Sequence, residues 1–178
     1  MNHRDAADIF VAGTRARGIY GILPDTMAPR RLPGPEGCHS DAHPFHLGVM
    51  AYIDDVPPNG GGLRLWPGSH KRVFHTFERQ HTSFRGEAFA KAMREVAEDT
   101  PAVDCYGPAG TVILWHHRLG HNPGTNHVGM NIRQAVLFDY IKSNVNDGPP
   151  PVDMWRDWSE ELRNAGRSAK AGLNNARL

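Results

Sequence analysis

One tripeptide in the first quarter of the chain, His39-Ser40-Asp41, carries two side chains that can bind a metal ion. In an extended backbone, residues i and i+2 point to the same side, so this imidazole and this carboxylate can reach a single ion. Such a pair, joined by a second histidine, forms the facial triad of non-haem Fe(II) oxygenases, which leaves coordination positions open. An H-x-D tripeptide alone is weak evidence, since most chance occurrences are surface residues.

Four histidines can complete this triad: His116, His117, His121 and His127. His116 and His117 continue an apolar run, and the alternation of a strand turns only one of them inward. His121 follows in a polar stretch, where a loop can bend it towards the metal. Spacing alone leaves the choice open, and an interpretation in which all four are surface or turn residues fits equally well.

Arg133 is a fourth candidate, in an apolar stretch that predicts a strand. It shares a face with Ala135 and Leu137, and an arginine among apolar neighbours is unfavourable unless it meets an anion. Its planar guanidinium suits a carboxylate, so a dicarboxylic co-substrate held at one end would satisfy it. The alternative is a pair with Asp139 or another acid on the sheet surface.

Short extended segments predict the elements that must position these side chains. Strands are expected at residues 17–23, 39–56, 63–66, 102–105, 110–115 and 131–141, and helices at 3–12, 87–98 and 152–164. The 19 glycines and 14 prolines favour an all-β body with many turns over a helical bundle. We expect a single domain over residues 1–178, with its core at about 17–141 and a helical, partly mobile extension at about 151–178.

Composition excludes several classes of protein. The formal charge is +1, with no basic run, so no nucleic-acid partner is expected. The two cysteines are too few for a disulfide framework and favour a reducing compartment. The N-terminus has no apolar signal, and no run approaches the ~18 apolar residues of a membrane span. The sequence therefore predicts a soluble, cytoplasmic protein without a membrane partner, and leaves its oligomeric state open.

Three motifs together resemble one known family. They are HSDAHP at residues 39–44, AYIDDVPPNGGGLRLWPGSHKR at 51–72 and GTVILWHHRLGHNPGTN at 110–126, and Arg133 follows them. In this order they resemble the phytanoyl-CoA dioxygenase family of Fe(II)/2-oxoglutarate oxygenases. The resemblance runs over residues 17–141, which are 125 of the 178 residues. It implies an all-β core with added helices, folded as a double-stranded β-helix, the cupin-like jelly roll.

The resemblance also implies roles for particular residues. His39, Asp41 and His121 would bind Fe(II), which selects His121 among the four candidate histidines. Arg133 would bind the distal carboxylate of 2-oxoglutarate. In the polar turn between His121 and Arg133, Asn126 and Thr125 would contact the co-substrate or brace the loop.

The implied reaction consumes O2 and 2-oxoglutarate, releases succinate and CO2, and hydroxylates an aliphatic carbon of a small molecule. Two alternatives stay open. One is a cupin-like metalloenzyme that does not use 2-oxoglutarate. The other is a non-catalytic jelly-roll binding module, favoured by the 38 residues before His39, fewer than family members usually have.

Overall fold

The computed structural model describes residues 15–27, 37–41, 47–76 and 86–140, together with residues 160, 161 and 164. The chain divides into two compact units, residues 1–148 and 149–178. All strands and helices described below belong to the first unit; in the second, residues 160, 161 and 164 are helical. The predicted helix at 3–12 and most of the one at 152–164 lie outside the described residues. The expected domain boundaries stay a prediction.

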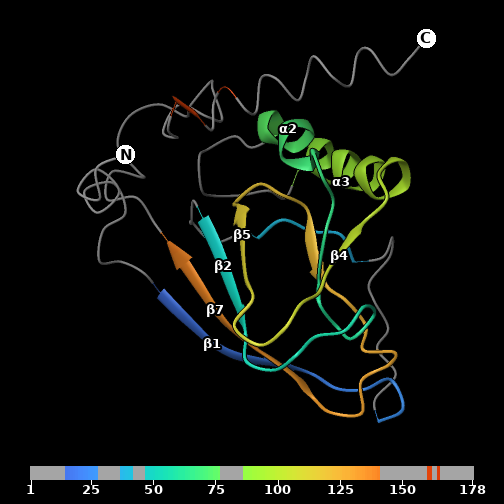
Figure 1. Cartoon of the computed structure of the whole chain (residues 1–178). Coiled ribbons are helices and arrows are strands. Elements are labelled where there is room, and N and C mark those ends of the chain that lie inside the picture. Colours follow the sequence, from blue (N-terminus) through green and yellow to red (C-terminus); the bar gives the residue numbers. More distant parts are fainter. Residues whose placement is uncertain are drawn as a thin grey trace. The chain divides into compact units, whose positions relative to one another are not determined.

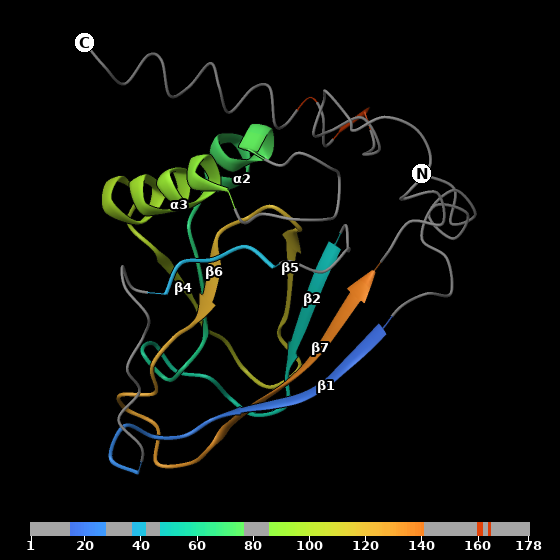
Figure 2. The same ribbon diagram turned by 180° about the vertical axis from the view of Figure 1, so that it is seen from behind.

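Two antiparallel sheets form the body of the first unit (Figures 1 and 2). The larger has the order β1-β7-β2-β5, and the smaller has the order β4-β3-β6. The strands are β1 (Arg15–Ile22), β2 (Leu47–Tyr52), β3 (Leu63–Leu65), β4 (Val103–Cys105), β5 (Val112–His116), β6 (His121–Pro123) and β7 (Arg133–Tyr140). Neighbours in each sheet are seldom consecutive in sequence, so the chain crosses repeatedly between the sheets, as in a jelly roll.

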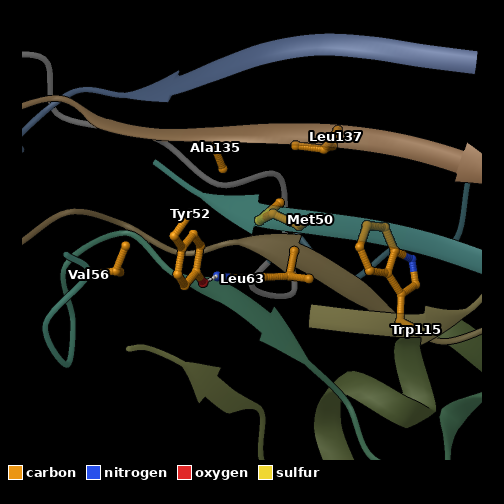
Figure 3. Close-up of a cluster of buried hydrophobic side chains, with 7 residues drawn as sticks. All are labelled: Met50, Tyr52, Val56, Leu63, Trp115, Ala135 and Leu137. Carbon is orange, nitrogen blue, oxygen red and sulfur yellow. Dashed lines mark hydrogen bonds between the residues drawn. The ribbon is translucent and has the colours of Figure 1, made fainter. Parts of the chain in front are cut away.

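A hydrophobic cluster joins the two sheets (Figure 3). Its buried members come mainly from β2, β5 and β7 of the large sheet and β3 of the small one: Met50, Tyr52, Val56, Leu63, Trp115, Ala135 and Leu137. Tyr52 ties the sheets directly, since its hydroxyl donates to the carbonyl of Cys105 and accepts the N–H of Leu63 at 2.9 Å. Burial raises the pKa of Tyr52 to about 12, so this hydroxyl keeps its proton and its bridge at neutral pH.

Two helices cover one end of the sheets. These are α2 (Ser69–Val73), continued by a 3-10 turn (Phe74–Thr76), and α3 (Glu87–Asp99). The buried face of α3 repeats at helical spacing through Phe89, Met93 and Val96, which pack with Trp66 and Val73 in a second cluster. No helix among the described segments is long and apolar enough to cross a membrane.

Most predicted elements are confirmed, with three exceptions. The strand expected at 39–56 is confirmed only over β2 (Leu47–Tyr52), and residues 42–46 lie outside the described residues. Strands at 17–23, 63–66, 102–105, 110–115 and 131–141 and the helix at 87–98 match β1, β3, β4, β5, β7 and α3. The five-residue α2 was not predicted, because it is too short to show a helical period. The loop expected around His121 is wrong: His121 begins β6, a short polar strand that pairs with β3.

Candidate metal centre

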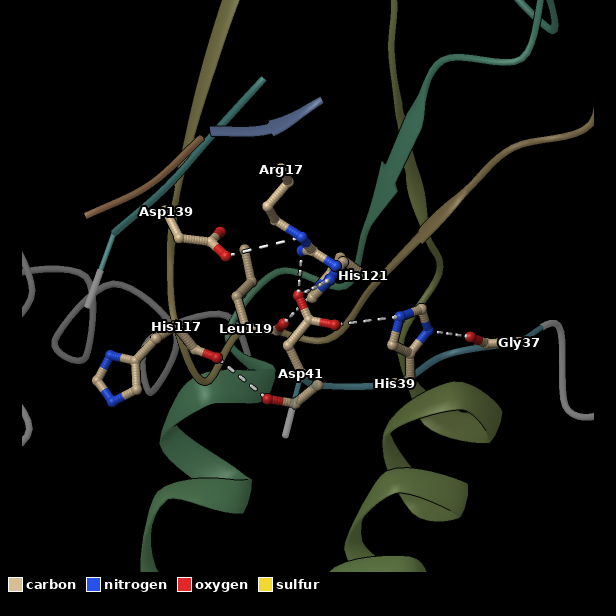
Figure 4. A network of polar contacts seen from close by, with 9 residues as sticks. Arg17, Gly37, His39, Asp41, His117, Leu119, His121 and Asp139 are labelled. Carbon is tan, nitrogen blue, oxygen red and sulfur yellow. Dashed lines mark hydrogen bonds and ion pairs between the residues drawn. The ribbon is translucent and has the colours of Figure 1, made fainter. Parts of the chain in front are cut away.

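Backbone pairing brings His39 and His121 together across 82 positions of sequence. The N–H of His39 donates to the carbonyl of His121 at 3.2 Å, and the N–H of His121 donates back at 2.8 Å. This isolated antiparallel bridge sets the two imidazoles next to each other, with ring centroids 4.7 Å apart and ring planes tilted by 48°. Since Asp41 follows two residues after His39, it projects towards the same point (Figure 4).

The three side chains offer one ligand atom each, and these atoms all lie within 4.8 Å of one another. The Nε2 of His121 is 3.4 Å from Oδ2 of Asp41, and the Nε2 of His39 is 3.8 Å from Oδ1. Ligands at right angles around an ion, with bonds of roughly 2.1 Å, stand about 3 Å apart. Small side-chain movements are therefore enough to close this cluster around a metal.

Both imidazoles are oriented by the carbonyl two residues upstream. The Nδ1 of His39 lies 2.9 Å from the carbonyl oxygen of Gly37, and the Nδ1 of His121 lies 2.9 Å from that of Leu119. A carbonyl oxygen can only accept, so each Nδ1 carries the proton and each Nε2 presents a lone pair towards Asp41. Two neutral imidazole nitrogens and one carboxylate are the donor set of a non-haem Fe(II) facial triad.

The charge state of His39 suits a ligand. Burial of the ring is the main reason that its pKa lies below 6.5, and the adjacent His121 lowers it further. The side chain keeps 48% of its surface exposed, so water weakens both effects. The direction is nevertheless the useful one, since a lowered pKa favours the neutral imidazole that a metal requires.

Two buried serines hold the turn that precedes His121. The hydroxyl of Ser40 donates to the carbonyl of His117 at 3.1 Å, and the hydroxyl of Ser69 accepts the N–H of Gly120 at 2.7 Å. Ser40 lies between two candidate ligand residues, so this bond ties the H-x-D segment to the turn before His121. The second bond anchors the same turn to α2. Together they limit how far the two halves of the cluster can separate.

The other candidate histidines lie elsewhere. His116 and His117 are buried and stack on each other at 4.3 Å. The side chain of His127 is 59% exposed and contacts the carboxylate of Asp25 at 2.6 Å. Within the described part of the chain, His121 is the only one of the four that gathers with His39 and Asp41.

One residue beside the cluster had no signal in the sequence. The Nη1 of Arg17 donates to Oδ2 of Asp41 at 2.9 Å, and its Nε lies 3.7 Å from Oδ2 of Asp139 (Figure 4). Burial by itself would lower the pKa of Arg17, but the two carboxylates outweigh it and raise the pKa. Arg17 is therefore a permanent cation at the edge of the cluster.

A cavity of about 610 Å³ opens beside the three candidate ligands. Its wall is built by β1, by the H-x-D segment and by β6, and its floor is the apolar interior of the jelly roll. The lining residues are Arg17, Tyr20, Gly21, Ile22, Leu23, His39, Asp41, Met50, Leu63, Trp115, His121, Asn122, Pro123 and Leu137. This volume suits a small molecule beside the metal position.

Arg133 lies inside the fold, on the face shared with Ala135 and Leu137. It is 4% exposed; its Nε donates to the carbonyl of Gly61 at 2.7 Å and its guanidinium lies 5.9 Å from the ring centre of Tyr52. It lines a separate cavity of about 740 Å³ and is not among the lining residues of the triad cavity. Its role towards a co-substrate stays a prediction.

Asn126 and Thr125 also lie away from the triad cavity. The fully buried Asn126 donates to the carbonyl of Asn131 at 2.9 Å and accepts the N–H of Gly129 at 2.7 Å, which braces the loop between β6 and β7. Thr125 lines a third cavity of about 300 Å³. The bracing alternative for Asn126 thus has direct support, while a contact of either residue with the co-substrate stays a prediction.

Comparison with known proteins places the fold and the family. The probable alpha-ketoglutarate-dependent hypophosphite dioxygenase of Stutzerimonas stutzeri is 28% identical over 107 residues, which are 60% of this chain and 36% of that protein. The chain thus spans little more than a third of this curated relative.

Two solved structures share the fold. The non-heme alpha-ketoglutarate-dependent carbocyclase SnoK from nogalamycin biosynthesis superposes with a TM-score of 0.52 at 20% identity, over 79% of this chain and 59% of SnoK. EvdMO1 does so with a TM-score of 0.50 at 18% identity, over 74% of this chain and 28% of that one. This likeness confirms the predicted jelly-roll core with added helices.

The family model described as phytanoyl-CoA dioxygenase matches residues 26–135. That interval holds 110 of the 178 residues and includes His39, Asp41, His121 and Arg133. Because the match extends over more than half of its length, the chain belongs to the phytanoyl-CoA dioxygenase family.

Proposed function

We propose that this chain is an Fe(II)- and 2-oxoglutarate-dependent dioxygenase that hydroxylates an aliphatic carbon of a small molecule. The observation that carries the proposal is the convergence of His39, Asp41 and His121, with both Nδ1 protons donated to backbone carbonyls. Family membership and the hypophosphite dioxygenase relative agree with it.

In this proposal each residue has a stated task. His39, Asp41 and His121 would hold Fe(II), and these three protein ligands would leave room for 2-oxoglutarate and O2. Iron with these co-substrates supplies the oxidising chemistry that replaces C–H by C–O and releases succinate and CO2. The protein orients the reactants, and the apolar floor formed by side chains such as Met50 and Leu137 keeps water from the reacting carbon.

Asp41 also bears on the reaction outcome. A carboxylate ligand occupies a position that a small residue would leave to a halide ion, so its presence favours hydroxylation over halogenation. The substrate itself would lie in the 610 Å³ cavity, next to β1. We propose a cytoplasmic setting, in agreement with a cysteine content of only two residues, Cys38 and Cys105.

A second candidate function is favoured by the position of Arg133. Since it lines a cavity other than that of the triad, a cupin-like metalloenzyme that does not use 2-oxoglutarate remains a competing proposal. The two proposals differ in one measurable property, namely whether 2-oxoglutarate chelates the bound metal and depends on Arg133 to do so.

The test uses the whole chain under anaerobic conditions. Fe(II) is added first and 2-oxoglutarate second, and we measure the visible charge-transfer band that appears when a 2-oxo acid chelates Fe(II). Wild type should give the band, and His121→Ala should lose both metal binding and the band. Arg133→Met should still bind Fe(II) but need at least tenfold more 2-oxoglutarate to reach the same band intensity. Arg72→Met is the matched control, because Arg72 pairs with exposed Asp99 at 3.1 Å on the helices.

Each result has one meaning. Metal binding without a band in wild type would overturn the 2-oxoglutarate proposal in favour of the cupin-like enzyme. No metal binding at all would favour a non-catalytic module. After admission of O2, succinate formation gives a second readout, and its loss in Arg133→Met but not in Arg72→Met supports the role of Arg133.

A further inference from the structure

Arg17 owes its position to an irregularity in β1. The pairing of β1 with β7 runs in register from Arg15 to Ala16, then shifts, so that Gly18 pairs with Leu137 and Arg17 is the extra residue of a β-bulge. Gly18 has a φ of +113°, a backbone conformation that side-chain-bearing residues rarely adopt. Bulges re-aim side chains, and this one lies next to the cavity wall.

The guanidinium of Arg17 lies between two carboxylates, one at the candidate metal centre and one buried in the sheet. Asp41 is a candidate metal ligand, and its Oδ2 accepts from Nη1 of Arg17 at 2.9 Å. Asp139 is 1% exposed on the inward face of β7, and its Oδ2 lies 3.7 Å from Nε of Arg17. Figure 4 shows Arg17 above Asp41 and reaching both acids, with His39 to the right of Asp41 and Asp139 to the left of Arg17.

We propose that Arg17 is a positioning residue, anchored by Asp139, that holds Asp41 in its metal-binding orientation. This rests on the proposed metal centre. A carboxylate can rotate and swing about two torsions, and a ligand must be held still to bind tightly. Arg17 binds one oxygen of Asp41 from outside the cluster, while Asp139 limits the movement of Arg17 itself.

The charges lead to the same conclusion. Asp139 is buried close to a site that must attract a divalent cation, and an uncompensated buried carboxylate is unfavourable. Arg17 neutralises it and leaves one net negative charge over the three groups, which resides on the ligand. Because a guanidinium stays protonated and has several donors in a fixed plane, it serves two acids at once; a lysine has only a point charge.

A competing explanation makes the opposite prediction. In that explanation the guanidinium competes with the metal ion for Asp41 and has to leave when metal binds. Removal of Arg17 would then tighten metal binding. The sign of the effect therefore distinguishes an orienting residue from a competitor.

The experiment titrates the full chain with Co(II) and follows the visible d–d absorption, which reports both affinity and coordination geometry. We expect Arg17→Met to weaken Co(II) binding 10- to 100-fold, the range usual for groups that orient a metal ligand. Arg17→Lys should recover part of the loss, whereas Arg72→Met, the control on α2, should match wild type. Asp139→Asn should weaken binding several-fold alone and have no further effect in the Arg17→Met background, because it acts through Arg17.

Unchanged or tighter binding in Arg17→Met would overturn the proposal, as would a full additional loss from Asp139→Asn in that background. If Arg17→Met does not fold, Arg17→Lys and Gly18→Ala test the proposal in its place. Gly18→Ala keeps the guanidinium but opposes the bulge, so it too should weaken Co(II) binding. Wild-type Co(II) affinity in both variants would overturn the proposal. If wild type itself binds no Co(II), the metal centre of the preceding section is refuted, and the role of Arg17 with it.

Discussion

Gly48 offers a quantitative test of how the core supports the metal centre. It lies on the inward face of β2, directly opposite Trp115 on β5. A Cβ at this position would stand 2.1 Å from Cε2 and 2.3 Å from Cζ2 of Trp115. Ordinary contact begins near 3.4 Å, so in Gly48→Ala the indole must retreat by about 1.3 Å, the difference between 3.4 and 2.1 Å.

The direction of that retreat is limited. Trp115 is 3% exposed and belongs to the main core cluster, but one side of it lines the triad cavity and its ring centre lies 5.5 Å from that of His121. The indole is therefore expected to move into the cavity and towards His121. Overpacking of this kind costs about 1–3 kcal/mol, partly offset by about 0.4–1 kcal/mol from the reduced freedom of the unfolded chain.

The net expectation for Gly48→Ala is a loss of about 1–2 kcal/mol in the free energy of unfolding. With an m-value of about 2 kcal/mol/M, the urea midpoint should fall by roughly 0.5–1 M. Co(II) affinity should fall as well, since His121 is disturbed. Urea denaturation followed by tryptophan fluorescence measures the first quantity, and the Co(II) titration measures the second.

Two variants serve as controls for this prediction. Gly86→Ala adds a Cβ where no atom lies within 4 Å and where φ is already −124°, so its effect should stay below about 1 kcal/mol. Trp115→Leu removes the clashing ring atoms, so Gly48→Ala should cost less in that background than alone. Wild-type midpoint and Co(II) affinity in Gly48→Ala would refute the packing argument.

Three further predictions concern groups outside the ligand cluster. Burial lowers the pKa of His70 from 6.5 to about 4, so on acidification the unfolded chain takes up a proton that the folded chain does not. The free energy of unfolding therefore has its full value above about pH 6.5 and declines as the pH falls towards 4, by on the order of 2 kcal/mol between pH 7 and 5. Urea unfolding at both pH values should show a smaller decline for His70→Gln than for wild type. Ser69→Ala leaves the buried N–H of Gly120 without its acceptor and should cost about 1–3 kcal/mol and weaken Co(II) binding, whereas an unaltered Co(II) affinity would show that the turn does not position His121. Asn126→Ala should lower the free energy of unfolding by a similar amount, because it releases the loop between β6 and β7. If the variant still folds and still binds Fe(II) but no longer gives the 2-oxoglutarate band, Asn126 contacts the co-substrate as well as bracing the loop.

Local patterns were sufficient for much of the fold. Strands such as β2, β5 and β7 have apolar runs or alternation, and α3 has apolar residues at helical spacing, so each was predictable from neighbouring residues alone. The polar strand β6 and the five-residue α2 were not, because their conformation comes from partners distant in sequence. Pairing with β3 defines β6, and packing of Val73 against α3 defines α2.

The candidate site, like the fold, was predictable from the sequence only in part. Residue types and the i, i+2 spacing of His39 and Asp41 were enough to predict a metal-binding pair, and the resemblance selected His121. Residue spacing could not make that selection, because the choice depends on the backbone bridge between residues 39 and 121. The inward direction of Arg133 followed from strand alternation, but the cavity that it lines did not.

By itself, then, the sequence determined the all-β class, the candidate donor set, and which of the longer segments are strands and which is a helix. These features depend on residues within a few positions of one another. The tertiary structure brought His121, rather than the other three histidines, beside the H-x-D pair, and only the tertiary structure placed Arg17 between Asp41 and Asp139. The physical reason is that these contacts join residues 24 to 122 positions apart, and they depend on strand register and on one bulge that no local pattern specifies.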